Sequence, residues 1–165
     1  MTALQEATTE AFTRLYREQY APMVRLARIT MGANATAGTH ATAEDVVQEA
    51  FAEVHRSYAR VQHPVAYLRR AVISRSLSAL RRWRVERRYL ASHAETEVVG
   101  PLGPEAAAVR VALARLRPRQ RAAVFLRYYL DLPEAAIAAA LGCRIGTVKS
   151  LLHRSHETLR RHLDD

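Results

Sequence analysis

The sequence predicts an all-α fold, arranged as two small helical domains joined by a flexible linker. Apolar residues recur at spacings of three and four along most of the 165 residues, and the alternation typical of strands is nearly absent. Glycine and proline gather at the breaks between the periodic segments. Almost half of the residues are hydrophobic, so the chain can form a packed core rather than remain disordered.

The first helix is expected from about Thr9 to Met31. The segment GANATAGTHA, residues 32–41, then ends the periodic pattern with two glycines and an asparagine. The positions expected to face inward on this helix are Phe12, Leu15, Tyr16, Met23, Leu26 and Ala27.

Two further helices are expected in the first half. Thr42 followed by Asp45 resembles a capping box, with Asp in the place where Glu is usual, and the helix that it begins should reach about Tyr58. Pro64 suits the first position of a helix, and that helix is expected to continue to about Arg88.

The segment ASHAETEVVGPLGP, residues 91–104, has little periodicity and contains two glycines and two prolines. It is expected to be an exposed, flexible linker between a domain of residues 1–90 and a domain of residues 105–165. Three prolines stand where helices of the second domain should begin, and the last helix should run from about Ile145 to Leu163. These prolines are Pro104, Pro118 and Pro133.

Residues 133–163 predict a helix-turn-helix, in which a short helix ending at Leu141 is followed by a turn and a second helix. Gly142 can adopt the left-handed conformation that ends a helix, and Ala138 is small enough for the two helices to approach closely. The second helix of such a motif enters the DNA major groove. The shared core would contain Ile137, Leu141, Cys143, Val148 and Leu151.

One face of the last helix is apolar, and the opposite face carries basic and small polar residues. That polar face could contact base edges near its N-terminus, with basic side chains, including Arg144 in the N-cap position, binding phosphates. The alternative is an ordinary helical hairpin whose basic face is only solvated. The apolar face contains Val148, Leu152, Ser155 and Leu159, and the polar face Gly146, Lys149, Ser150, His153 and Arg154.

The charge composition indicates a polyanionic partner. The formal net charge is +9, and only Lys149 among the twenty-five basic residues is not an arginine. Eight arginines lie between Leu68 and Arg88, with Tyr58, Tyr67, Trp83 and Tyr89 in or beside that helix. Such a basic, aromatic surface suits unpaired nucleic acid. The alternative is a solvated arginine face with Tyr67 and Trp83 in the core.

An acidic and amide-bearing surface stands out in this basic chain, within the segment TAEDVVQEAF, residues 42–51. Asp45, Gln48, Glu49 and Ala52 fall on the side of the predicted helix opposite its apolar stripe. Such a surface could bind a partner through hydrogen bonds. From periodicity alone the simpler interpretation is favoured, in which the acidic residues only complement the helix dipole.

Several function classes find little support in the sequence. The single cysteine, Cys143, excludes a disulfide framework and a cysteine-rich zinc site, and the seven histidines are scattered. Neither a nucleophile motif nor a phosphate-binding glycine loop is present, so we expect no catalysis, no cofactor and no metal. No apolar run reaches roughly 18 residues and the N-terminus is not a secretory signal, so we expect a cytoplasmic protein without a membrane partner.

Three segments carry a family resemblance: TAEDVVQEAF, HPVAYLRRAVISRSLSALRRWRVERR and LARLRPRQRAAVFLRYYLDLPEAAIAAALGCRIGTVKSLLHRSHETLRRHL. Taken together, they resemble an extracytoplasmic-function (group IV) bacterial sigma factor. The resemblance covers nearly the whole chain, from about Phe12 to Leu163. It implies a non-enzymatic factor that directs RNA polymerase core to promoters, recognises the −35 and −10 elements and helps promoter melting.

The resemblance also implies where the partners bind. The acidic surface would bind the β′ clamp helices of the polymerase, and the second domain would also touch the β flap. The −10 element would be opened by the first domain, with a base flipped into the loop 57–63, and the −35 duplex would bind the helix-turn-helix. An anti-sigma factor is a common partner in the family. The implied −10 residues are Tyr58, Arg60, Ser74, Arg75, Arg81 and Arg82, and the implied −35 residues are Arg144, Gly146, Thr147, Lys149, Ser150, His153 and Arg154.

The chain departs from the family pattern at four positions. Ser74 replaces a frequent Asn and therefore changes the capacity for −10 base readout, since a hydroxyl cannot make the paired contacts of an amide. Ser78, Tyr67 and Ala136 replace a frequent Asp, Trp and Glu. A conventional repressor or activator is the main alternative, in which the first domain would dimerise or sense a signal. The acidic surface beside a basic, aromatic helix argues against it.

Overall fold

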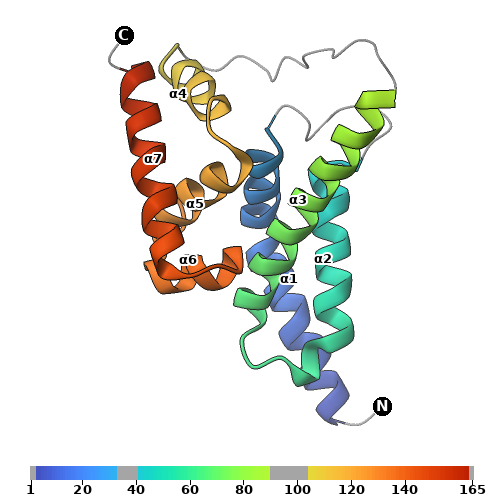
Figure 1. Ribbon diagram of the computed structural model, residues 1–165. Helices are drawn as coiled ribbons and strands as arrows, with labels where there is room; N and C mark the ends of the chain where they lie inside the picture. The colour runs from blue at the N-terminus through green and yellow to red at the C-terminus, as the bar shows by residue number, and fades with distance from the viewer. Residues whose placement is uncertain (1–2, 33–40, 90–103, 164–165) are drawn as a thin grey trace.

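The computed structural model describes residues 3–32, 41–89 and 104–163. Within these ranges every regular element is a helix, which confirms the predicted all-α class (Figure 1). The expected linker at 91–104 falls almost entirely outside the described residues. The elements are α1 (Ala3–Met31), α2 (Ala43–Ser57), a short 3-10 turn η2 (Tyr58–Arg60), α3 (Pro64–Tyr89), α4 (Pro104–Ala114), α5 (Pro118–Tyr128), α6 (Glu134–Leu141) and α7 (Ile145–Leu163).

Helices α1, α2 and α3 pack side by side as one group, which we call the N-terminal group (Figure 1). Their apolar stripes face one another, as helical periodicity predicts. Of the six residues expected to face inward on α1, four are buried and Phe12 and Tyr16 are half-buried against the core. Fully buried side chains of this group include Met23, Leu26, Val47, Val54, Leu68 and Val72.

Helices α4 to α7 form the C-terminal group, in which α5, α6 and α7 pack on one another and α4 lies against α7. The two groups are also in contact with each other: α5 packs on α1, and α6 packs on α3 (Figure 1). One hydrophobic cluster runs through both groups, from Leu15 on α1 to Leu152 on α7. The first three helices and the last four are therefore held against each other in this arrangement.

Two helix starts differ from the sequence prediction. Helix α1 begins at Ala3 rather than Thr9, because ALQEATTE is rich in good helix formers although it lacks an apolar stripe. It also continues through Pro22. Pro133 is the residue before α6 rather than its first residue, and its carbonyl accepts hydrogen bonds from the backbone N–H groups of Ala136 and Ile137.

The predicted capping box at the start of α2 is confirmed. The Asp45 backbone N–H donates to the Thr42 hydroxyl at 3.2 Å, and the Thr42 backbone N–H donates to the Asp45 carboxylate at 2.9 Å. Two of the N–H groups that a helix start leaves without partners are thus satisfied reciprocally.

Among the described helices, no single one is long and apolar enough to cross a membrane; α6 and α7 pass the test of length and composition only as a pair bent by 99°.

Candidate functional site

The acidic surface lies along the outer face of α2. Asp45, Gln48, Glu49 and Ala52 are all exposed, while the opposite side of the helix is buried, so the sequence assigned these four positions to the correct face. Each polar member also has a partner within the chain. Their binding role stays a prediction, but their local roles are visible.

Asp45 has a structural role in the capping box. Its carboxylate accepts from both the backbone N–H and the hydroxyl of Thr42, each at 2.9 Å. The backbone hydrogen bond from Thr42, followed by the side-chain bond, holds the pKa of Asp45 below its ordinary value. The negative charge at the helix start is therefore stabilised locally by its hydrogen bonds with Thr42.

The other two polar members connect α2 to its neighbours. The Gln48 amide donates to the Tyr16 hydroxyl at 3.0 Å. Glu49 forms an ion pair with Arg75 of α3 at 2.8 Å. Tyr16 also stacks on Tyr20 and packs against Phe51, so Gln48 is positioned by an aromatic cluster. Ala52 contributes no polar group, which leaves room on the surface between its longer neighbours.

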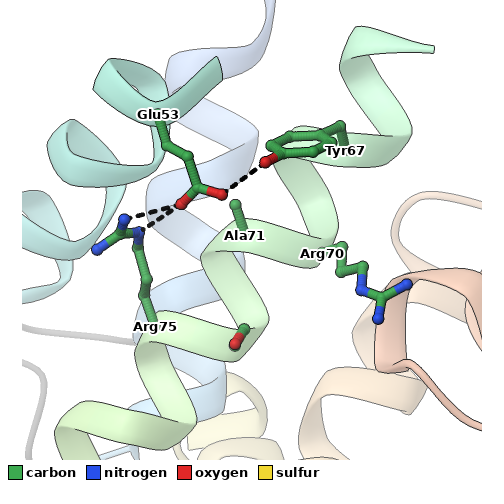
Figure 2. A pocket seen from close by; sticks show the side chains of 6 residues that line it. Glu53, Tyr67, Arg70, Ala71 and Arg75 are labelled. Atoms are coloured by element: carbon green, nitrogen blue, oxygen red, sulfur yellow. Dashed lines mark hydrogen bonds and ion pairs between the residues drawn. The ribbon is translucent and has the colours of Figure 1, made fainter. Parts of the chain in front are cut away.

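A surface pocket of about 280 Å³ lies on α3 beside α2. Its lining combines one carboxylate, two guanidinium groups, a phenol and a small hydroxyl, so it offers donors and acceptors together. Figure 2 shows the Glu53 side chain pointing from α2 towards Tyr67 and Arg75, with Arg70 reaching towards the neighbouring ribbon. The lining residues are Glu53, Tyr67, Arg70, Ala71, Ser74 and Arg75.

Glu53 is the centre of the hydrogen-bond network in this pocket. One carboxylate oxygen accepts from the Tyr67 hydroxyl at 2.7 Å, and the other accepts from two nitrogens of Arg75 at 2.8 and 3.2 Å. The hydrogen bond from Tyr67, and then that from Arg75, lowers the pKa of Glu53. The hydrogen bond that the Tyr67 hydroxyl donates to Glu53 also raises the pKa of Tyr67, because it stabilises the protonated phenol. The network fixes two α3 side chains relative to α2.

The structure distributes the predicted −10 residues over several environments. Ser74 and Arg75 both line the pocket, but Arg75 is already ion-paired with Glu49 and Glu53. Tyr58 is half-buried and packs edge-on against Phe12, with ring centroids 5.6 Å apart. The remaining three, Arg60, Arg81 and Arg82, are exposed, and Arg81 donates to the Ser78 hydroxyl.

The helix-turn-helix has the predicted geometry. Helix α6 ends at Leu141, and Gly142 has φ +61°, the left-handed conformation expected there. The backbone N–H of Cys143 then donates to the Ala138 carbonyl at 3.0 Å, which closes the turn. Of the predicted core, Ile137, Leu141 and Val148 are buried, while Cys143 and Leu151 are half-buried.

Every predicted −35 residue is exposed, whereas Val148, Leu152 and Ser155 on the opposite face of α7 are buried. Arg144 precedes the helix, and its carbonyl accepts from the backbone N–H groups of residues 147 and 148, as an N-cap residue does. A Cβ at Gly146 would meet nothing within 4 Å, so a partner can approach the backbone closely there. The exposed set is Arg144, Gly146, Thr147, Lys149, Ser150, His153 and Arg154.

Acidic side chains partly balance the charge of this face. The Lys149 Nζ lies 3.9 Å from a carboxylate oxygen of Glu134 on α6, and the His153 Nε2 lies 3.6 Å from a carboxylate oxygen of Glu157. Arg144 and Arg154 have no ion pair with another described residue. Exposed arginines before and along such a helix can bind phosphates or guanine edges. The face is therefore suited to a nucleic-acid duplex.

Two features were missed by sequence reasoning. Glu53 was not identified, although a carboxylate late in α2 that faces Tyr67 and Arg75, two turns apart on α3, could have indicated an inter-helix pair. Arg121 is 9% exposed and bonds across the two groups, a role that no local pattern indicates. Within the described ranges, no group of three or more metal-binding side chains comes together.

Comparison with known proteins connects this geometry to one family. The model of sigma-70 region 4 matches residues 106–159. The chain is 32% identical over 162 residues to the ECF RNA polymerase sigma factor SigM of Mycobacterium tuberculosis, covering 93% of this chain and 77% of that protein. It is also 32% identical over 126 residues to an RNA polymerase sigma-E factor of Streptomyces coelicolor, covering 73% and 71%.

Two solved structures share the fold. The first is the sigma factor RpoE in complex with the anti-sigma factor NepR from Bartonella quintana, with a TM-score of 0.78 and 21% identity, covering 94% of this chain and 98% of that one. The second is CnrH in complex with the cytosolic domain of CnrY, with a TM-score of 0.66 and 21% identity, covering 94% and 89%.

Proposed function

This chain belongs to the ECF sigma factors of bacterial RNA polymerase, and from that premise we propose which of its surfaces bind the polymerase and the promoter. A sigma factor directs RNA polymerase to promoters in transcription initiation, and it is a regulatory factor rather than a catalyst. The observation that carries the assignment is the similarity to SigM, which runs through both helical groups rather than through the helix-turn-helix alone.

We assign the polymerase contact to Asp45, Gln48, Glu49 and Ala52. Their shared exposure on α2 supports this assignment, because an acidic surface on a chain of net charge +9 is suited to a basic protein partner and repels DNA. The partner surface would be the β′ clamp helices, and the C-terminal group would also contact the β flap.

The −10 element is assigned to α3 and the turn before it, and the −35 element to the start of α7. The pocket beside Ser74 and the exposed Arg81 and Arg82 support the first assignment, since they combine hydrogen-bonding groups with positive charge. The exposed face that follows Arg144 supports the second, because its side chains can reach base edges while the buried face packs on α5 and α6.

An anti-sigma factor is a further proposed partner. The solved structure of RpoE, which resembles this chain over 94% of its length, is a complex with the anti-sigma factor NepR. The partner of this chain would act by covering one or both of the promoter-binding surfaces.

Co-elution with core RNA polymerase that lacks any sigma factor tests the assignment. The protein is expected to co-elute in a stoichiometric complex and to support transcription from a mapped promoter. Ala52→Arg should abolish co-elution, because it places a large cation in the centre of the acidic surface while disturbing no hydrogen bond of the chain. Ala21→Arg is the matched control, since Ala21 is an exposed alanine on α1 and the change adds the same charge.

Two outcomes would contradict these assignments. If the unmodified chain binds duplex DNA but never core polymerase, it acts as a stand-alone DNA-binding regulator. If Ala52→Arg co-elutes as well as Ala21→Arg, the polymerase contact lies elsewhere on the chain.

A further inference from the structure

Gln48, the neutral member of the acidic surface, is held in place by a residue of another helix. Its side-chain Nε2 donates a hydrogen bond to the Tyr16 hydroxyl of α1 at 3.0 Å. The Gln48 side chain is exposed, whereas Tyr16 is half-buried. An exposed glutamine normally samples many rotamers and loses much conformational entropy when a partner fixes it. The bond to Tyr16 therefore restrains Gln48 before any partner binds.

Tyr16 is itself fixed by an aromatic cluster. Its ring stacks on Tyr20, with ring centroids 5.2 Å apart, and packs against Phe51, with ring centroids 4.7 Å apart. Phe51 is 2% exposed and belongs to the hydrophobic core. A tyrosine side chain has only two rotatable χ angles, so these ring contacts leave its hydroxyl little freedom. The Tyr16 hydroxyl is thus a rigid point beside the acidic surface.

The packing of this cluster does not require the hydroxyl of Tyr16. A phenylalanine could make each of the ring contacts, and one hydrogen bond from an exposed side chain contributes little to stability, because water competes for both groups. Among the described residues, only Gln48 forms a hydrogen bond with this hydroxyl. The hydroxyl therefore acts on Gln48 rather than on the core.

Gln48 keeps unused hydrogen-bonding capacity while it is held. Its amide has two N–H donors and a carbonyl oxygen, and the bond to Tyr16 uses one donor. Its charged neighbours on the surface are also held, Asp45 by the capping box and Glu49 by an ion pair with α3. Carboxylates attract a basic partner over a wide range of directions, whereas a directional amide bond fixes the register of that partner. Gln48 is therefore the group on this surface whose orientation matters most for docking.

We propose that Tyr16 is a positioning residue for polymerase binding, which holds the Gln48 side chain in the orientation that the polymerase binds. The inference rests on the proposed assignment of the acidic surface to the polymerase. Immobilising a rotamer-rich side chain weakens association, and a side chain that is already immobilised avoids this loss. The gain expected from one such side chain is about two- to tenfold in the dissociation constant. Tyr16 acts through Gln48 and needs no contact with the polymerase.

The first test is an equilibrium titration of the full chain with core RNA polymerase that lacks any sigma factor. Tyr16→Phe removes only the hydroxyl, so it should raise the dissociation constant about two- to tenfold. Tyr20→Phe is the matched control, because Tyr20 lies in the same ring stack and no described residue forms a hydrogen bond with its hydroxyl. Its dissociation constant should equal that of the wild type. Equal affinities of wild type and Tyr16→Phe, or equal losses in the two variants, would overturn the proposal.

A double-mutant cycle with Gln48→Ala separates positioning from a direct contact. Without the amide, the Tyr16 hydroxyl has no side chain to position, so Tyr16→Phe should cause no further loss of affinity in the Gln48→Ala background. A loss of the same size in both backgrounds would show that Tyr16 contacts the polymerase itself or only supports the fold, and the positioning role would be refuted.

A measurement on the free protein keeps the test decisive if Gln48→Ala binds too weakly to be titrated. The NMR order parameter of the Gln48 side-chain amide reports its motion on the ps–ns timescale. It should be high in the wild type and in Tyr20→Phe, and it should fall in Tyr16→Phe. If the order parameter is the same in all three proteins, Tyr16 does not hold Gln48 and the proposal is wrong.

The outcomes also separate this proposal from the proposed function. If the unmodified chain does not bind core polymerase, the assignment of the acidic surface fails, and this inference fails with it. If the unmodified chain binds normally and Tyr16→Phe binds equally well, the assignment stands and only the role of Tyr16 is refuted.

Discussion

Replacement of Glu53 by glutamine tests the network that joins α2 to α3. Glutamine keeps the shape and can still accept from the Tyr67 hydroxyl, but it removes the carboxylate that Arg75 binds through two nitrogens. Hydrogen bonds to a charged group contribute about 1.5–3 kcal/mol. The Glu53 and Arg75 side chains are 32% and 31% exposed, so solvent screening reduces this, and we expect a loss of about 1–2 kcal/mol in the free energy of unfolding.

The pH dependence of stability shows whether the negative charge of Glu53 is the cause of this loss in the free energy of unfolding. The pKa of Glu53 is lower in the folded protein than in the unfolded chain, so its stabilising effect is complete above the unfolded value of about 4.3 and disappears as the pH falls through the folded value. Urea unfolding should therefore show a gap between wild type and Glu53→Gln at pH 7 that closes in acid.

Two results would refute this reasoning. Equal unfolding midpoints of wild type and Glu53→Gln at pH 7 would show that the Glu53–Arg75 ion pair contributes nothing to stability. A gap that persists below the folded pKa would show that packing, not charge, is lost. Glu18→Gln on the exposed face of α1 is the control, and its effect should lie within about 0.5 kcal/mol at either pH.

Three further substitutions have defined outcomes. Thr42→Ala removes the hydroxyl of the capping box and should cost about 1 kcal/mol in urea unfolding; an unchanged midpoint would show that Asp45 caps α2 without it. Gly142→Ala should lower stability by about 1–2 kcal/mol, because the left-handed backbone is strained for alanine while the nearest atom, 3.6 Å away on Arg70, allows the methyl group; a neutral thermal melt would contradict this. Arg154→Ala should weaken binding to the −35 duplex by about 1–3 kcal/mol in an anisotropy titration if it makes a bidentate base contact, whereas Arg160→Ala should not; equal losses would place Arg154 outside the reading face.

Local features were the most predictable from sequence. The capping box at Thr42 and the left-handed turn at Gly142 each depend on a few neighbouring residues, and the structure has both where the sequence placed them. The exposed face of α7 followed from helical periodicity for the same reason. The helix start at Ala3 was missed because periodicity detects only helices that bury a stripe.

Contacts between distant segments were not predictable in the same way. Arg121 and Thr30 are separated by 91 residues, and nothing in the arginine-rich sequence distinguishes this arginine from the exposed ones. Arg75 was assigned to the −10 element by the family resemblance, and only the fold shows that Glu49 and Glu53 hold it. Composition indicates the sign of the net charge on a surface, whereas tertiary packing decides which of the charged side chains are already paired within the protein.

The Glu49–Arg75 ion pair would link the two proposed binding surfaces of the N-terminal group thermodynamically. Glu49 belongs to the proposed polymerase surface, and Arg75 lines the pocket of the proposed −10 surface. A basic group of the polymerase that bound Glu49 would compete with Arg75 and would leave it held by Glu53 alone. Arg75 would then be freer to bind a phosphate, and by reciprocity a phosphate on Arg75 would free Glu49 for the polymerase. Two ligands of opposite charge, an enzyme and a nucleic acid, would each raise the affinity of this protein for the other.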